Sequence, residues 1–408
     1  MVKILIVNQP LSNRGDESAH KALVRELLKL IPDLSIRVLF VSCPSQYSIS
    51  QVSVIDERVN YINIHSCLRY SKVSEIALRQ PIKKILWRIH PTMREIVSHY
   101  EWSDVVLCAP GGICMGGFQD WKHLYFLKLT QYCKKPIAYF GRSIGPFSTA
   151  TQLDENFKNI SYELLNYFSY LSLRDSKSED IAKEIGVPYI STVDSAFLET
   201  PQVCLPYEVN MLLKDKQYMV FVPNYLLWHY KYQGCFTIKE LVEFYCEIIH
   251  KVWKLYPKLS IVMLPQTFDQ GGMRDDINLF RLIAENLNDP RIIVVPDCYS
   301  SDIQQTIISK SKFLIGARYH SIVFAINQRI PFIALSYEHK MMGMLETLNC
   351  TDNLIDFRDT MLSASAKELC LGKIEELLLN LDVNTDAFLS AKTISMKGLN
   401  MFVKMFSK

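Results

Sequence analysis

Short, continuous apolar runs alternate with amphipathic stretches along this chain of 408 residues, and the alternation limits the folds it can adopt. A strand that is apolar on both faces has to be covered on both, as in a parallel sheet flanked by helices. The pattern therefore predicts an α/β protein with parallel sheets. The predicted strands lie in residues 3–8, 103–110, 136–141 and 169–175 and, later in the chain, in residues 218–223, 259–265, 291–296, 312–317 and 331–336.

The strand pattern stops near Asp194 and resumes at residue 218. Between them, residues 199–216 show little periodicity and contain Pro201 and Pro206, so they are predicted to form a linker. Two βαβ series predict two doubly wound, Rossmann-like lobes that face a cleft, with ligands bound beyond the carboxyl ends of the strands. The predicted parts are an N-terminal lobe (1–198), the linker (199–216), a C-terminal lobe (217–363) and C-terminal helices (364–408).

Composition and charge exclude several classes of protein. The chain has 45 Lys and Arg against 42 Asp and Glu, which is too balanced for a dedicated nucleic-acid binder. Its apolar runs are too short for a transmembrane helix or a signal peptide, so we expect a cytoplasmic protein. The 11 cysteines form no CxxC pair and the histidines no HxxxH or HExxH pair. We therefore expect reduced thiols, no bound metal and no resident cofactor.

Polar residues and glycines follow the predicted strands of the N-terminal lobe. Asn13 and Asp16 lie in a loop that leads into a helix, where Asp16 either caps the helix or hydrogen-bonds a ligand. Gly111 and Gly112 either present backbone N–H groups to an anion or sugar or form a tight turn. Arg142 follows the next strand and either faces the cleft or pairs with a surface acid.

Cationic residues end strands in both lobes. Arg174 is hard to explain structurally, because arginine is rarely buried unpaired, and an anionic ligand would supply its partner. Arg318, His320 and Ser321 precede a nearly all-apolar, hence buried, helix, whose N-terminal N–H groups favour anions. Arg318 can hold a phosphate or carboxylate bidentately, and His320 can exchange a proton near neutral pH. The alternatives are a capping box with a structural histidine and, for Lys340 at the next helix, a solvated surface lysine.

These cations indicate the chemistry of the substrate. No aspartate cluster accompanies them in the sequence, which argues for a phosphate- or carboxylate-bearing substrate held without a divalent metal. Gln266 and Thr267 end another strand, where they either contribute polar groups or form an ordinary turn. The chain has no GxSxG elbow for serine hydrolysis, and no GxGxxG after the first strand for a nicotinamide dinucleotide.

An ordered set of motifs resembles the polysaccharide pyruvyl transferase family. The resemblance runs from the first strand to about Leu348 and implies a two-lobed fold like that of the GT-B glycosyltransferases. It also implies transfer of a pyruvyl group from phosphoenolpyruvate to two hydroxyls of a sugar, which forms a cyclic ketal and releases phosphate. The motifs are NRGDE, APGG, GRSIGPF, LRDSKSEDIAKEIGV, TVDSAF, GARYHSIVFAI and SYEHKMMGML.

The same resemblance implies roles for single residues. Arg318 is expected to bind the donor and His320 to act as general acid, while Arg174 and Lys340 are expected at the donor phosphate or carboxylate. Arg142 stands where glutamine is common in the family, and APGGIC lacks the family's third glycine, so the identity of the acceptor stays open. Ser321 completes the expected donor site, and the expected acceptor residues are Asn13, Asp16, Gly111, Gly112 and Arg142.

The expected function is that of a pyruvyltransferase acting on a precursor of a capsule or exopolysaccharide. We expect a sugar acceptor that contains galactose and is lipid-linked. The alternatives are a nucleotide-sugar-dependent glycosyltransferase of the same architecture and a non-catalytic anion-binding or scaffold protein. The C-terminal tail carries Lys397, Lys404 and Lys408 beside Leu399 and Phe402. It is either a peripheral contact to the inner face of a membrane or a packed helix that bridges the lobes.

Overall fold

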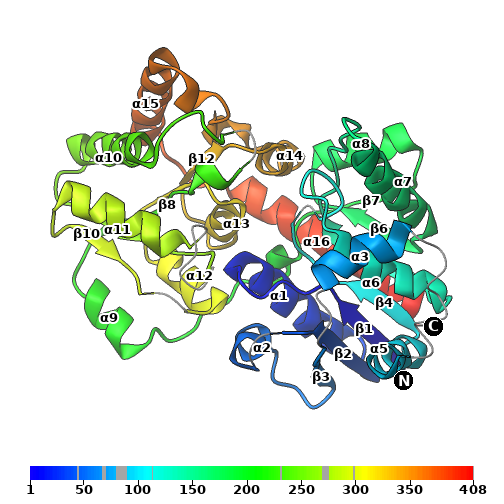
Figure 1. The fold of residues 1–408 in the computed structure, drawn as a ribbon. Coiled ribbons are helices and arrows are strands. Elements are labelled where there is room, and N and C mark those ends of the chain that lie inside the picture. Colours follow the sequence, from blue (N-terminus) through cyan, green and yellow to red (C-terminus); the bar gives the residue numbers. More distant parts are fainter. Residues whose placement is uncertain are drawn as a thin grey trace. The chain divides into compact units, whose positions relative to one another are not determined.

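The protein forms two compact α/β units, each built around a parallel sheet covered by helices (Figure 1). Unit 1 comprises Met1–Leu11, Asp16–Leu198 and Lys392–Lys408, and unit 2 comprises Ser12–Gly15 and Glu199–Ala391. The parallel α/β class predicted from the apolar runs is confirmed. A computed structural model describes residues 1–43, 46–66, 70–79, 90–112, 114–229, 232–268, 275–296 and 299–407.

Unit 1 contains a seven-stranded sheet in the order β3-β2-β1-β4-β5-β6-β7, with every pair parallel. The strand order reverses between β1 and β4, and sheets of this kind bind ligands at the carboxyl ends near such a reversal. The strands are β1 (Val2–Val7), β2 (Leu34–Val41), β3 (Val59–Ile64), β4 (Val105–Cys108), β5 (Ile137–Arg142), β6 (Tyr170–Leu173) and β7 (Ile190–Ser191).

Helices cover both faces of the unit 1 sheet. One face packs against α5, α6, α7 and α8, and the other against α1, α2 and the C-terminal part of α16. Phe402 of α16 lies edge-on to Phe140 and Tyr170 of the sheet, so the end of the chain completes this core. The helices are α1 (Arg14–Leu30), α2 (Gln46–Val52), α3 (Tyr70–Arg79), α5 (Pro91–Trp102), α6 (Trp121–Tyr132), α7 (Gln152–Tyr167), α8 (Ser176–Ile185) and α16 (Thr385–Phe406).

Unit 2 contains a six-stranded parallel sheet in the order β10-β9-β8-β11-β12-β13, with the reversal between β8 and β11. The five strands predicted for this half of the chain are all present, and the short β13 is an addition. They are β8 (Tyr218–Val222), β9 (Ser260–Met263), β10 (Ile292–Val294), β11 (Leu314–Gly316), β12 (Phe332–Ser336) and β13 (Leu354–Asp356).

The unit 2 sheet packs one face against α10, α11 and α15. On the other face, α13 approaches β11 closely because Gly316 has no side chain: a Cβ there would lie 2.1 Å from Oγ of Ser321. This contact fixes the start of α13 against the strand end. The helices of unit 2 are α9 (Tyr207–Leu213), α10 (Ile238–Leu255), α11 (Asp276–Leu287), α12 (Ser301–Ser309), α13 (Tyr319–Asn327), α14 (His339–Thr347) and α15 (Ala364–Leu379).

The observed units differ from the predicted parts at three places. Residues 12–15 are grouped with unit 2, the expected linker 199–216 belongs to unit 2 and contains α9, and residues 392–408 belong to unit 1. The tail returns to unit 1 because Leu399 and Phe402 are fully buried in its core, which favours the packed helix over a membrane contact.

Within the described ranges, no helix is both long and apolar enough to cross a membrane. None of the described cysteines takes part in a disulfide bond. Cys67, Cys298 and Lys408 lie outside the described residues.

Candidate functional site

The predicted donor residues Arg318, His320 and Ser321 lie where the sequence places them, at the carboxyl end of β11 and the start of α13. Arg318 is the N-cap residue of α13, and the whole helix is buried. Ser321 Oγ donates a hydrogen bond to the carbonyl oxygen of Arg318 (2.6 Å), so the structure gives Ser321 a local structural role. Its predicted contact with the donor stays a prediction.

Asp276 at the start of α11 orients the guanidinium of Arg318. Its Oδ1 accepts a hydrogen bond from Nη2 of Arg318, and its Oδ2 accepts from the backbone N–H groups of Gln266 (3.0 Å) and Thr267 (2.9 Å). Burial raises the pKa of Asp276, although these hydrogen bonds and Arg318 lower it. The carboxylate therefore ties β9 and β11 together at their carboxyl ends.

At the carboxyl ends of β11 and β9, two buried N–H donors have no hydrogen-bond acceptor among the residues described. They are Nε of Arg318 and Nε2 of Gln266, a residue that is 1% exposed. Buried donors in folded proteins are nearly always paired, so such groups at a strand edge require an explanation. A ligand that carries oxygen acceptors supplies one.

Asn13, which was expected on the acceptor side, lies in unit 2. It forms an isolated antiparallel bridge with Thr267, and the backbone N–H of Arg14 donates to the carbonyl oxygen of Gln266 (2.9 Å). The guanidinium of Arg14 lies 4.8 Å from the ring centroid of Phe268. The loop after β1 is thus held at the carboxyl end of β9, beside the predicted donor residues.

Gly15, in the first turn of α1, packs against the predicted general acid. A Cβ built on Gly15 would lie 1.9 Å from Nδ1 of His320, so the backbone approaches the imidazole as closely as a glycine allows. Tyr319 and Phe324 contact the same ring, with centroids 5.1 and 6.3 Å away. The ring of His320 is thereby held in one orientation, with the residue 6% exposed.

Lys340 lies at the start of α14, after the next strand of the sheet, and is ion-paired. Its Nζ is 2.7 Å from Oε2 of Glu338, and Oε1 of Glu338 is 3.2 Å from Nε2 of His229. Burial would raise the pKa of Glu338, but Lys340 and His229 together lower it to about 2. Glu338 is therefore a buried carboxylate between two nitrogen-bearing side chains.

The expected cluster of cations differs from the observed one in its charge. Arg318 and Lys340 lie in one unit, and each is paired with an acid, Asp276 or Glu338. The sequence shows no aspartate cluster beside these cations, but the fold pairs each of them with a single acid, as a buried charge requires. Asp276 follows a different strand from Arg318, whereas Glu338 follows the same strand as Lys340 and precedes it by two residues.

Arg174, the fourth expected cation, is a buried residue of unit 1. It forms an ion pair with Asp194, and its Nε donates to Oγ of Ser143 (2.9 Å). The partner that the sequence analysis sought in an anionic ligand is therefore an acid of the chain itself. The following residue, Asp175, caps α8 by accepting from the backbone N–H of Ser178 (2.8 Å). Donor binding by Arg174 stays a prediction.

The remaining predicted acceptor residues come together in unit 1. Gly111 adopts a φ of +152°, and a Cβ there would lie 3.1 Å from Oδ1 of Asp16 and 3.5 Å from Nη1 of Arg142. Arg142 is fully buried and donates to the carbonyl oxygens of Ala109 and Gly112, the latter at 2.9 Å. Arg142 thus holds the glycine loop in place, an arrangement that neither of its predicted alternatives describes.

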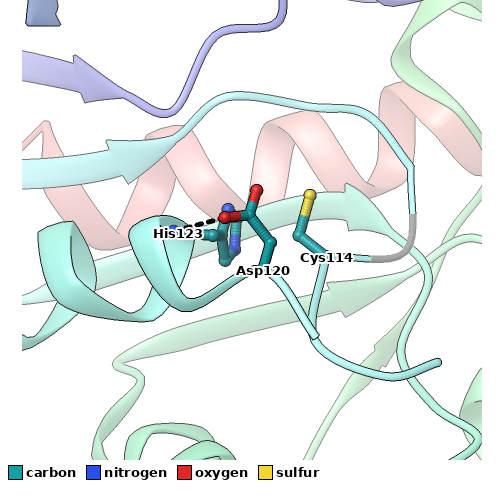
Figure 2. Close-up of side chains that lie close together, drawn as sticks. All are labelled: Cys114, Asp120 and His123. Atoms are coloured by element: carbon teal, nitrogen blue, oxygen red, sulfur yellow. Dashed lines mark hydrogen bonds between the residues drawn. The ribbon is translucent and has the colours of Figure 1, made fainter. Parts of the chain in front are cut away.

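Three potential metal ligands lie beside Arg142, although none was predicted. Atoms of Cys114, Asp120 and His123 lie within 4.8 Å of one another, and Asp120 also caps α6 by accepting from the backbone N–H of His123 (Figure 2). However, Nη2 of Arg142 is only 3.0 Å from Sγ of Cys114, and burial raises the pKa of that thiol to about 12. A metal ion needs a thiolate there and would face a fixed guanidinium, so the donor set does not fit one.

Comparisons with known proteins agree with this architecture. The chain is 23% identical over 390 residues to the amylovoran biosynthesis protein AmsJ of Erwinia amylovora, covering 88% of this chain and 89% of that protein. The UDP-GlcNAc 2-epimerase of Methanocaldococcus jannaschii superposes with a TM-score of 0.60 at 13% identity over 99% of both chains. The enzyme of Neisseria meningitidis gives 0.58 at 12% identity, over 99% of this chain and 100% of its own.

At such low identities, the solved structures establish the fold, which is GT-B-like as expected. The family is established by sequence. The family model described as polysaccharide pyruvyl transferase matches residues 13–339, a range that includes every predicted site residue except Lys340, which follows it directly. This chain therefore belongs to the polysaccharide pyruvyl transferase family.

Proposed function

We propose that this protein transfers the pyruvyl group of phosphoenolpyruvate to two hydroxyls of a sugar in a surface-polysaccharide precursor, forming a cyclic ketal and releasing phosphate. Family membership supports pyruvyl transfer, and the similarity to AmsJ supports a role in polysaccharide biosynthesis. The observation that carries the donor assignment is a pair of buried donors, Nε of Arg318 and Nε2 of Gln266, that have no acceptor among the described residues. They lie at the carboxyl ends of β11 and β9, on either side of β8 in the unit 2 sheet.

Phosphoenolpyruvate has the chemistry that these groups require. Its carboxylate and phosphate oxygens accept hydrogen bonds, and an arginine can engage an oxyanion through several N–H groups at once. The pair with Asp276 uses Nη2 of Arg318 and leaves Nε for the donor. The N-terminal N–H groups of α13 and the ammonium of Lys340 add to the attraction for an anion.

His320 is assigned the proton transfer. As an imidazolium, it protonates the methylene carbon of phosphoenolpyruvate, which leaves an oxocarbenium-like centre at the neighbouring carbon. The first sugar hydroxyl adds to that carbon, and its proton returns to the imidazole. The second hydroxyl then displaces phosphate and closes the ketal ring, and its proton leaves with the phosphate. Two C–O bonds form and one C–O bond breaks.

The test combines the purified protein with phosphoenolpyruvate and a panel of methyl glycosides that includes methyl β-galactoside. We expect phosphate release together with a glycoside product heavier by one pyruvyl ketal, and loss of both with His320→Ala. Calorimetry distinguishes pyruvyl transfer from the alternative function, which is glycosyl transfer from a nucleotide sugar. Tight binding of a nucleoside diphosphate without binding of phosphoenolpyruvate would identify a glycosyltransferase instead.

A further inference from the structure

Unit 1 contains a cavity of about 160 Å³ that none of the predicted acceptor residues lines. It lies at the carboxyl ends of β1 and β2, next to the first turns of α6. Its lining includes Asn8, Gln9, Ser42, Lys122 and Phe126. The carboxyl edge of a doubly wound sheet is where such folds bind ligands, and the lining residues here include both hydrogen-bonding and aromatic side chains.

Gln9 presents a buried acceptor. The residue is 7% exposed, and its Nε2 donates to the carbonyl oxygens of Pro10 (2.8 Å) and Asp16 (3.4 Å). Its Oε1 is buried and has no hydrogen-bond donor within the described part of the chain. Since the amide nitrogen is anchored, the oxygen is held in place for a donor from a ligand. The anchor also joins the cavity to Asp16, a predicted acceptor residue.

Lys122 presents a donor to the same cavity. The residue is half-buried, and no Asp or Glu oxygen of the described residues lies within 4.0 Å of its Nζ. The neighbouring ring of Phe126 is apolar, with its centroid 6.0 Å from Nζ of Lys122. Burial lowers the pKa of Lys122 although the charge of Asp120 raises it, and an oxygen-bearing ligand would counteract the effect of burial further. A cation donor, an amide acceptor and an aromatic wall therefore share one cavity.

The backbone that opens the cavity is unusual. Asn8 and Ser42, each just beyond the end of a strand, have φ values of 63° and 58°, a region that residues other than glycine seldom adopt. Both conformations are held by hydrogen bonds. Nδ2 of Asn8 donates to the carbonyl oxygen of His123 (3.1 Å), and the backbone N–H of Ser42 donates to the carbonyl oxygen of Ile64 (2.9 Å). Strained positions of this kind concentrate at ligand sites.

We propose that this cavity binds one sugar residue of the acceptor, with a sugar hydroxyl donating to Oε1 of Gln9 and a sugar oxygen accepting from Nζ of Lys122. Phe126 supplies the apolar wall that a pyranose ring requires. The volume is below the roughly 300–1,000 Å³ of pockets for drug-sized ligands, so it suits a single ring. Naming this sugar the acceptor rests on the proposed function, whereas its binding does not.

The experiment measures glycoside binding by saturation-transfer NMR in the absence of phosphoenolpyruvate. The probes are methyl β-galactoside and methyl β-glucuronide, so that a neutral sugar and an acidic sugar are compared. We expect at least one probe to bind the wild-type protein and to bind Lys122→Gln and Gln9→Met about tenfold more weakly. The control is Lys128→Gln, on the same helix, whose lysine is ion-paired with Glu163 and does not line the cavity.

Lys122→Gln is the decisive variant, because the Gln9 substitution also removes the hydrogen bonds to Pro10 and Asp16. Lys122→Arg, which keeps the cation, should restore binding at least in part. Failure of both probes to bind the wild-type protein, or wild-type affinity in Lys122→Gln, overturns the proposal. If the protein never consumes phosphoenolpyruvate, the proposed function fails, and glycoside binding still reports on the cavity, so the two failures are distinguishable.

Discussion

The backbone of Gly15 lies so close to the imidazole of His320 that a Cβ on Gly15 would be 1.9 Å from Nδ1 of His320. The two residues are 305 positions apart, and both belong to unit 2. The backbone at the start of α1 therefore packs directly against the ring of the proposed general acid, and any side chain at residue 15 displaces that ring.

Gly15→Ala should lower the rate of pyruvyl transfer about 100-fold, because a shift of about 1 Å in a catalytic group costs on that order. The measurement is the kcat for phosphate release, with circular dichroism to verify the fold. Gly372→Ala on α15 is the matched control, since a Cβ at that position meets nothing within 4 Å. Wild-type kcat in Gly15→Ala would show that the position of the imidazole is unimportant.

His320→Asn should reduce kcat about 10²- to 10⁴-fold, the contribution typical of a general acid. The affinity for phosphoenolpyruvate, measured by calorimetry, should change much less, because the amide keeps the size and polarity of the imidazole. A loss of affinity as large as the loss of kcat would instead make His320 a binding residue.

Arg318→Ala should destabilise the protein by about 3–5 kcal/mol, since it leaves the buried carboxylate of Asp276 unpaired. Adding Asp276→Asn should recover part of that stability, measured by urea unfolding, without recovering the binding of phosphoenolpyruvate. If the double variant binds the donor normally, Arg318 serves the fold alone.

The carboxylate of Glu338 predicts a pH-dependent stability. Its pKa falls from the usual 4.5 to about 2 in the folded protein, so its contribution is complete above the unfolded value and is lost as the pH falls towards 2. The shift corresponds to on the order of 3 kcal/mol. Urea unfolding should show Glu338→Gln clearly less stable than wild type at pH 7, with the gap narrowing by pH 3.5. A gap that is constant with pH contradicts this.

The Arg174–Asp194 pair separates a structural role from a donor-binding one. Arg174→Met alone should cost about 3–5 kcal/mol of stability, because it leaves the buried carboxylate of Asp194 without its ion-pair partner. Arg174→Met/Asp194→Leu should recover most of that lost stability. If Arg174 acts only within the fold, the double variant binds phosphoenolpyruvate with wild-type affinity. A selective loss of binding in this stable double variant supports the predicted donor contact.

Strands that are buried on both faces were predictable, because their apolar runs are continuous. β2 was not predicted because Ser35 and Arg37 interrupt its apolar run. In the structure the guanidinium of Arg37 lies 4.0 Å from the ring centroid of Trp102, which covers it. β13 escaped because three residues carry no periodicity. Local pattern thus identifies strands whose burial is uniform and misses those whose polar residues are covered by distant side chains.

The same distinction applies to the site. The positions of Arg318, His320 and Lys340 at strand ends followed from local sequence, since parallel strands bring their carboxyl ends to one edge. The acid partner of Arg318 did not, because Asp276 is 42 residues away and carries no motif. The partner of Lys340 was within reach of local sequence, since Glu338 precedes it by two residues. The contact between Asn13 and Thr267, which are 254 residues apart, depends on the tertiary fold. For that reason the sequence predicted Asn13 on the acceptor side, whereas the structure groups it with unit 2.

The C-terminal half of α16 has a consequence for biogenesis. Residues 392–408 supply Leu399 and Phe402 to the core of unit 1, yet the ribosome makes them after all of unit 2. Unit 1 therefore reaches its native packing only after residues 392–408 have been made, and a fragment that stops at residue 198 exposes the apolar surface that α16 covers. However unit 2 folds, the core of unit 1 is complete only when β1 and α16 pack in the same cluster.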